Sequence, residues 1–196
     1  MKIKFEDLSY IADAHQFHPK NDKKAFRKWD GRTPYFIHPL WCATTILTET
    51  RLDEKTRVEG YYTLLYHDLL EDTTQSLPAS LEKRIEELVK DMTFLGGSEQ
   101  EMNEIWSKLE EIRLYKLYDK VSNLLDGTWM SGEKRRAYGE YVSRLCLDVE
   151  QNYGALNITL MARAIISFPF EHDAMKRLEA KTNTMGGENG LYQRKI

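Results

Sequence analysis

The segment Tyr66–Thr73 (YHDLLEDT) gathers side chains that can bind a metal ion or move a proton. It carries His67, Asp68, Glu71 and Asp72 at the end of an otherwise apolar stretch. An imidazole and a carboxylate together make a mixed nitrogen and oxygen site, which suits ions such as Mn, Fe or Zn. A His-Asp pair alone is more often a helix end or a solvated face, so a metal site needs further ligands.

Two other residues can supply those ligands. His38 lies between aromatic and aliphatic residues, and its ordinary interpretation is a partly buried side chain with satisfied hydrogen bonds. Asp119 lies among the apolar positions of a predicted long helix, where a buried acid costs free energy unless it is paired or bound to a metal. A salt bridge from Asp119 to Lys116 or Lys120 is the alternative to a metal.

The neighbouring residue types suit hydrolysis of a phosphate group. A divalent ion lowers the pKa of a water ligand and polarises a phosphoryl oxygen, and a carboxylate such as Glu71 or Asp72 can accept the proton of the water. Asn123, one turn after Asp119, can hydrogen bond in the same cavity. Basic side chains neutralise charge on a transferring phosphoryl group. The basic candidates are Arg27, Lys28, Arg32 and Lys116.

The elements that position these residues are predicted to be helices, because apolar residues recur at spacings of three and four. The predicted helices run from about Phe5 to His15, Pro39 to Thr50, Asp53 to Leu70, Leu81 to Met92, Glu99 to Leu125, Lys134 to Tyr153 and Leu156 to Ser167. No strand alternation is seen, which predicts an all-α fold in one domain, residues 1–181. Residues 182–196 contain several glycines and few apolar residues, and they are predicted to be a flexible tail.

Composition bounds the class of protein. The chain has 196 residues, 41% hydrophobic and 30% charged, as in an ordinary globular domain. A net charge of -3 argues against a general nucleic-acid binder but not against a small phosphorylated substrate. No long apolar run or signal peptide is seen, so we expect no membrane span and a cytoplasmic location. Cys42 and Cys146 fit buried thiols in a reducing compartment, and a homo-oligomer is compatible with the sequence.

The chemical residues occur in a recognisable order. Four residues of this chain follow one another as H…HD…D, and this order resembles that of the HD-domain phosphohydrolase superfamily. The four residues are His38, His67, Asp68 and Asp119. Three longer stretches are similar to the hydrolase domain of RelA/SpoT proteins, above all the small stand-alone SpoT homologues. They are RKxxGxTPYxxHP (Arg27 to Pro39), HDxxEDT (His67 to Thr73) and KLxDKxxNL (Lys116 to Leu124). The resemblance covers about residues 5 to 165.

This resemblance implies an HD-domain helical bundle with one divalent ion, commonly Mn, bound by those four residues; Fe, Zn, Mg and Co are the other candidates. It implies removal of the 3′-pyrophosphate from guanosine tetra- or pentaphosphate, although some small relatives remove a phosphate from NADPH. Glu71 and Asp72 match the acidic pair that activates the attacking water. Asn123 matches a substrate-contacting asparagine, and Arg27 and Lys28 match a basic pair near the nucleotide.

Some residues depart from the family pattern. Related hydrolases usually carry an arginine shortly after the asparagine, where this chain has Leu124-Leu125-Asp126, and Arg32 stands where a glycine or an acid is common. Guanine selectivity is therefore not predicted. Two alternatives stay open: an HD hydrolase of another nucleotide, such as NADPH or a deoxynucleotide, and a metal- and nucleotide-binding sensor with little turnover. A sensor has no chemical need for both Glu71 and Asp72.

Overall fold

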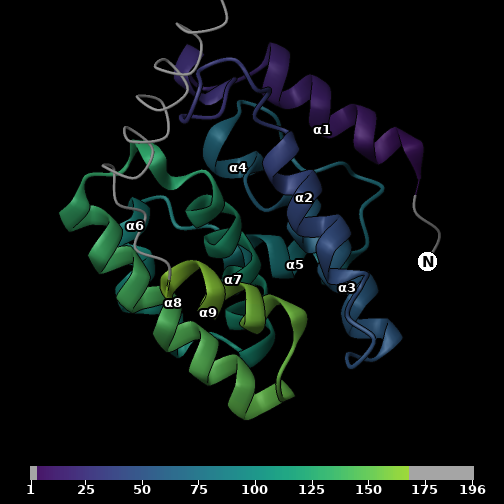
Figure 1. Ribbon diagram of the computed structural model, residues 1–196. Coiled ribbons are helices and arrows are strands. Elements are labelled where there is room, and N and C mark those ends of the chain that lie inside the picture. The colour runs from purple at the N-terminus through teal and green to yellow at the C-terminus, as the bar shows by residue number, and fades with distance from the viewer. Residues whose placement is uncertain (1–3, 168–196) are drawn as a thin grey trace, which may run out of the picture. The chain divides into compact units, whose positions relative to one another are not determined.

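The computed structural model describes residues 4–167, and the regular elements of this part are all helical (Figure 1). The α-helices are α1 (Phe5–Phe17), α2 (Ile37–Ile46), α3 (Glu54–Tyr66), α4 (Leu69–Asp72), α5 (Lys83–Met92), α6 (Gly97–Glu104), α7 (Glu110–Leu125), α8 (Gly132–Tyr153) and α9 (Asn157–Ser167). The predicted all-α fold is confirmed for these residues. The predicted domain boundary at 181 and the tail at 182–196 lie outside the described residues.

Helix α7 is the centre of the core. Figure 1 shows it between α8 on one side and α2 with α3 on the other, and it packs against all three. Every residue from Leu114 to Ser122 is buried, so the helix is enclosed on all sides. A helix buried all round is expected to be apolar, yet Lys116, Asp119 and Lys120 lie within this stretch. These charges must find partners inside the protein.

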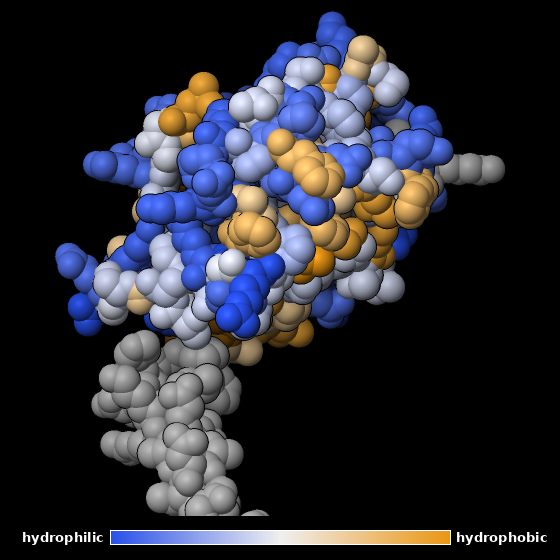
Figure 2. Space-filling view, turned by 90° about the horizontal axis from the view of Figure 1, so that it is seen from above, coloured by the Kyte–Doolittle hydropathy of each residue, from blue (hydrophilic) through white to orange (hydrophobic). Residues whose placement is uncertain are grey.

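The outer surfaces of the helices carry most of the charge. Seen from above the fold, hydrophilic side chains dominate the surface and hydrophobic ones form separate patches (Figure 2). Helix α5 illustrates the pattern, since Ile85, Leu88, Val89 and Met92 are buried on one face of a helix that is otherwise polar. None of the helices between residues 4 and 167 has both the length and the apolar character of a membrane span.

The predicted helix from Asp53 to Leu70 is in fact two helices. Its start is confirmed, because the Asp53 carboxylate accepts a hydrogen bond from the backbone N–H of Thr56 at 2.9 Å. The helix ends at Tyr66, however, and α4 begins only at Leu69. The His67 ring donates from Nδ1 to the carbonyl of Leu64 at 2.7 Å, and so takes an acceptor that a continuing helix would share with a backbone N–H.

The predicted helix from Glu99 to Leu125 was also wrong as a single element. Helix α6 ends at Glu104, a short 3₁₀ turn covers Ile105–Ser107, and α7 starts at Glu110 after an extended Leu109. Ile105 is fully buried in the core, and Lys108 forms an ion pair with Asp91 at 2.9 Å. These tertiary contacts hold the break in place, and a local apolar pattern does not reveal them.

The buried carboxylate of Glu49 ties three helices together just beyond the end of α2. It accepts hydrogen bonds from the backbone N–H groups of Asn157 at 3.0 Å and Ile158 at 2.9 Å, at the start of α9. The Tyr118 hydroxyl on α7 donates to the same carboxylate at 3.0 Å. Glu49 therefore compensates the free N–H groups of one helix terminus and fixes the position of α7 beside α2.

Helices α2, α3 and α7 approach closely at Gly60, so a methyl group there should destabilise the protein. A Cβ atom at Gly60 would lie 2.4 Å from Ile46 Cδ1 and 2.7 Å from Tyr115 Cε1. We expect Gly60→Ala to lower the free energy of unfolding by about 1–3 kcal/mol, measured by urea denaturation. Gly139→Ala in α8 is the control, because its Cβ meets nothing within 4 Å, and it should stabilise by about 1 kcal/mol. Equal stability of the two variants would contradict the close approach.

Candidate metal centre and substrate cavity

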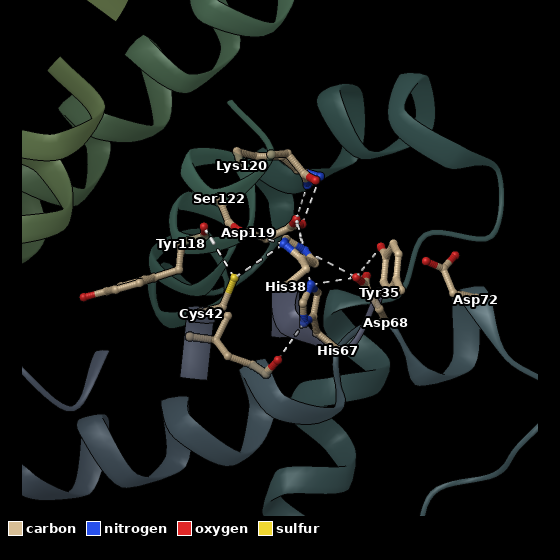
Figure 3. A network of polar contacts seen from close by, with 12 residues as sticks. Tyr35, His38, Cys42, His67, Asp68, Asp72, Tyr118, Asp119, Lys120 and Ser122 are labelled. Carbon is tan, nitrogen blue, oxygen red and sulfur yellow. Dashed lines mark hydrogen bonds and ion pairs between the residues drawn. The ribbon is translucent and has the colours of Figure 1, made fainter. Parts of the chain in front are cut away.

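The two histidines and two aspartates predicted from the sequence meet at one point (Figure 3). His38 comes from α2, His67 and Asp68 from the turn between α3 and α4, and Asp119 from α7. One ligand atom each of His38, His67 and Asp68 lie within 4.8 Å of one another. Asp119 Oδ1 lies 3.3 Å from His38 Nε2 and 3.8 Å from His67 Nε2. All four side chains are buried.

Both imidazole rings are oriented so that one nitrogen is left free. Nδ1 of His67 donates to the Leu64 carbonyl, and Nδ1 of His38 lies 2.8 Å from the Ser122 hydroxyl oxygen. Both Nε2 atoms are buried and lack a hydrogen-bond partner among residues 4–167. A nitrogen held in this way by a contact at the other ring nitrogen is the usual arrangement of a metal-binding histidine. Two such nitrogens and two carboxylates therefore fit a divalent metal ion.

The electrostatics of the cluster favour a cation. Burial lowers the pKa of His67, but Asp68 and Asp119 more than offset this effect and raise that pKa to about 9. Burial also lowers the pKa of His38. Burial acts to raise the pKa of Asp68, yet the two histidines hold it below its usual value. The carboxylates thus stay ionised and stabilise positive charge at this point.

Asp119 divides its two oxygens between different partners. Oδ2 lies 3.2 Å from Lys116 Nζ and 2.9 Å from Lys120 Nζ. Oδ1 faces the two histidines and accepts a hydrogen bond from Asn123 Nδ2 at 2.7 Å. The salt bridge that was the alternative to a metal is present, but it uses the oxygen that points away from the histidines. A metal ligand and a salt bridge are therefore compatible in this residue.

A cavity of about 280 Å³ opens beside the cluster. Its charged lining residues are Lys23, Lys24, Arg27, Lys28, Asp68, Glu71, Asp72, Glu101, Asp119, Lys120 and Lys134. Tyr35, Asn123, Trp129, Met130 and Tyr138 add polar and aromatic surface. The bottom of the cavity, where Asp68 and Asp119 lie, is therefore acidic, and its rim is rich in lysine and arginine. Such a distribution suits a ligand that carries phosphate groups.

The predicted acidic pair lines this cavity. Burial and the nearby Asp68 raise the pKa of Asp72, although an ion pair with Lys24 opposes the shift. Burial raises the pKa of Glu71, whose Oε1 accepts a hydrogen bond from the backbone N–H of Phe94 at 2.7 Å. A carboxylate with a raised pKa is a stronger base once ionised, as removal of a proton from water requires.

Arg27 and Lys28 both reach the cavity, as predicted from the sequence. Arg27 is buried and donates from Nε to Asp126 Oδ2 at 2.6 Å and from Nη2 to Asn123 Oδ1 at 3.0 Å. Lys28 Nζ lies 4.4 Å from the ring centre of Trp129, and Lys134 Nζ lies 4.8 Å from the same ring. Arg27 is thus held in place within the wall, whereas two lysines share one aromatic ring at the rim.

Two predicted substrate contacts lie elsewhere. Lys116 is 1% exposed and contacts Asp119 from behind, and the cavity is lined by Lys120 instead. Arg32 is exposed and does not line the cavity. Its backbone N–H bonds the Asp30 side chain at 2.9 Å in a turn that Gly31 completes with a φ of 65°. This turn directs the residue away from the site.

Several lining residues had no role in the sequence-based prediction. Lys24 pairs with Asp72, and the Tyr35 hydroxyl donates to Asp68 Oδ2 at 2.8 Å. Both belong to the segment that leads into His38, so their closeness to that motif was the available signal. Trp129 and Lys134 follow α7 and begin α8, and only the tertiary fold brings them to the cavity.

The predicted all-α helical bundle is confirmed, and a solved structure shares its fold. No protein-family model and no curated protein matches the chain. Among solved structures, it is similar to a metazoan ortholog of SpoT, described as hydrolysing ppGpp and playing a role in starvation responses. The identity is 21% and the TM-score 0.62, over 84% of this chain and 96% of the other.

The contact between Ser122 and His38 should govern metal affinity. Ser122→Ala removes the group that orients the His38 ring, and loss of such an outer partner typically weakens metal binding by about 10- to 100-fold. Isothermal titration with Mn measures the effect. Ser143→Ala is the matched control, since its hydroxyl bonds only the Gly139 carbonyl within α8. Unchanged affinity in Ser122→Ala would show that the hydrogen bond does not position the ligand.

Proposed function

We propose that this protein is a metal-dependent phosphohydrolase acting on a phosphorylated nucleotide, with guanosine tetra- or pentaphosphate as the leading substrate and the 3′-pyrophosphate as the leaving group. One observation carries the proposal above the others. Two buried imidazole nitrogens, on His38 and His67, have no hydrogen-bond partner among residues 4–167 and face two carboxylates at the bottom of a cavity whose rim is basic. Structural similarity to a SpoT ortholog that hydrolyses ppGpp supports the same assignment.

The ion is held by four residues in this proposal: His38, His67, Asp68 and Asp119. Nitrogen and oxygen donors in equal number suit Mn, with Fe, Zn, Mg and Co as alternatives. When bound, the ion supplies Lewis-acid chemistry that activates a water ligand and polarises a phosphoryl oxygen.

The side chains around the centre have distinct tasks. Asp72 accepts the proton of the attacking water, and Lys24 beside it keeps the carboxylate ionised before the reaction. Glu71 uses Oε1 to bind the Phe94 backbone, which leaves its other oxygen to orient the water. Asn123 bridges Asp119 and Arg27, and it places its amide at the wall where a sugar or phosphate would lie.

The rim is built for a polyanion. Lys28 and Lys134 lie over Trp129, and no carboxylate forms an ion pair with either among residues 4–167. Their uncompensated charge can therefore bind phosphate groups of the substrate. A small nucleotide fits a cavity of this size, whereas a net charge of -3 does not suit a nucleic acid.

The Arg27–Asp126 ion pair favours the second candidate, a hydrolase of another nucleotide such as NADPH or a deoxynucleotide. Asp126 belongs to the segment Leu124–Asp126, which stands where related hydrolases usually carry an arginine, and its carboxylate accepts a hydrogen bond from Arg27 Nε. Asp126 contacts none of the four proposed metal ligands but holds Arg27, which lines the cavity, so the difference bears on which nucleotide is bound and not on the reaction. A cytoplasmic location agrees with the two buried free thiols, Cys42 and Cys146.

Product release from a substrate panel tests the proposed reaction. With Mn present, we expect pyrophosphate from guanosine tetraphosphate and little release from NADPH or from nucleoside and deoxynucleoside phosphates. Release from one of the other compounds alone would retain the metal centre and identify the second candidate. If the protein binds Mn and releases nothing from any compound, it is a sensor and the hydrolase proposal fails.

Variants of the acidic pair separate catalysis from metal binding. Asp72→Asn should keep Mn and lower the turnover rate by about 100-fold or more, because it removes the general base. Glu71→Gln should also keep Mn and lower the rate, because it changes the carboxylate that orients the water. His67→Ala should lose metal and turnover together, since a ligand is missing. Mn content by elemental analysis and the initial rate of product release are measured side by side. An Asp72→Asn and a Glu71→Gln variant that both match the parent rate would contradict the acid–base assignment.

A further inference from the structure

Glu101 completes a closed ring of buried charges beside the proposed metal centre, and its carboxylate also lines the cavity. Its Oε2 lies 3.2 Å from Lys116 Nζ and 2.8 Å from Lys120 Nζ. The same two ammonium groups lie 3.2 and 2.9 Å from Asp119 Oδ2. All four residues are more than nine-tenths buried, with Glu101 4% exposed. Glu101 is thus separated from the metal ligand Asp119 by one layer of lysines.

The position of Glu101 depends on the break between α6 and α7. In an unbroken helix, Glu101 and Lys116 would lie about 22 Å apart along the axis, because each residue rises by 1.5 Å. The turn at Ile105–Ser107 folds α6 back so that Glu101 reaches the lysines. The Tyr141 hydroxyl on α8 donates to Glu101 Oε1 at 3.1 Å, whereas the lysines are bound through Oε2.

Charge balance shows what Glu101 contributes. The ring holds two carboxylates and two ammonium groups, so it is neutral as a unit. Without Glu101, the ring would keep one carboxylate and two ammonium groups, so its net charge would change from zero to +1 beside the histidines. Positive charge at that place opposes the binding of a divalent cation. The lysines would also be free to move toward Asp119 Oδ1, the oxygen that faces the histidines.

We infer that Glu101 is a positioning residue for the metal centre: it holds Lys116 and Lys120 on Asp119 Oδ2 and offsets their charge, so that Oδ1 remains a ligand. Glu101 contacts neither histidine and is not itself a ligand in this scheme. The inference rests on the metal site of the proposed function. The inference adds that metal affinity depends on helix α6, although none of the four proposed ligands lies on that helix.

Mn affinity of charge variants tests this inference by isothermal titration on the full chain. Glu101→Gln should bind Mn about 10- to 100-fold more weakly than the parent, as for other outer partners of metal ligands. Lys116→Met should bind Mn at least as tightly as the parent, because it removes an opposing charge and does not line the cavity. The double variant Glu101→Gln with Lys116→Met should recover most of the lost affinity. Tyr141→Phe, which keeps all charges, should change the affinity little.

The outcomes distinguish a positioning role from a structural one. Recovery in the double variant supports the inference, because a loss caused by poor folding would persist or worsen. Glu101→Gln with parental Mn affinity, or a double variant as weak as the single one, would overturn it. If the parent bound no Mn, the proposed site and this inference would both fail. If the parent bound Mn, showed these shifts and hydrolysed nothing, only the proposed hydrolase function would fail.

Discussion

The fold is organised around the cost of burying charge at the centre of a helical core. Two imidazoles and two carboxylates meet where α2, α7 and the turn after α3 come together, and all four are shielded from water. Burying such groups is unfavourable unless each is paired, bonded or bound to an ion. The Leu64 carbonyl, the Ser122 hydroxyl and the two lysines beside Asp119 meet most of this demand. The Nε2 atoms of His38 and His67 are left without a hydrogen-bond partner among residues 4–167.

The same constraint explains the shape of the surrounding chain. The segment before α2 is anchored at its start by a bridge between Pro19 and Thr73, and a second bridge, between Phe26 and Pro34, closes a loop within the segment. The backbone N–H of Lys20 adds a hydrogen bond to the Asp72 carbonyl at 2.9 Å. This anchoring brings the basic loop over the acidic pair, so opposite charges gather on one side of the cluster. The basic loop and the acidic pair therefore form facing walls of the cavity, and their opposite charges compensate one another.

The sequence predicted which residues meet at the candidate site better than it predicted the helices around them. His38, His67, Asp68 and Asp119 were predicted because residue type and order are local properties. The breaks after Tyr66 and after Glu104 depend on contacts with distant residues, and an apolar pattern with a helical period runs through both. For the same reason, the spacing did not separate Lys120, which lines the cavity, from Lys116, which lies behind Asp119. Side-chain direction is set by packing and becomes visible only in three dimensions.

The carboxylate of Glu49 has a consequence for the order in which the chain folds. Its backbone partners, Asn157 and Ile158, lie 108 and 109 residues further along. After Glu49 is synthesised, the ribosome must therefore add more than half of the chain before the backbone N–H groups at the start of α9 can hydrogen bond to this carboxylate. Contacts of such long sequence separation form slowly, since a large loop must close first. Until α9 docks, α2 and the α7 face that carries Tyr118 stay incompletely packed, and the nascent chain is most vulnerable to aggregation in that interval.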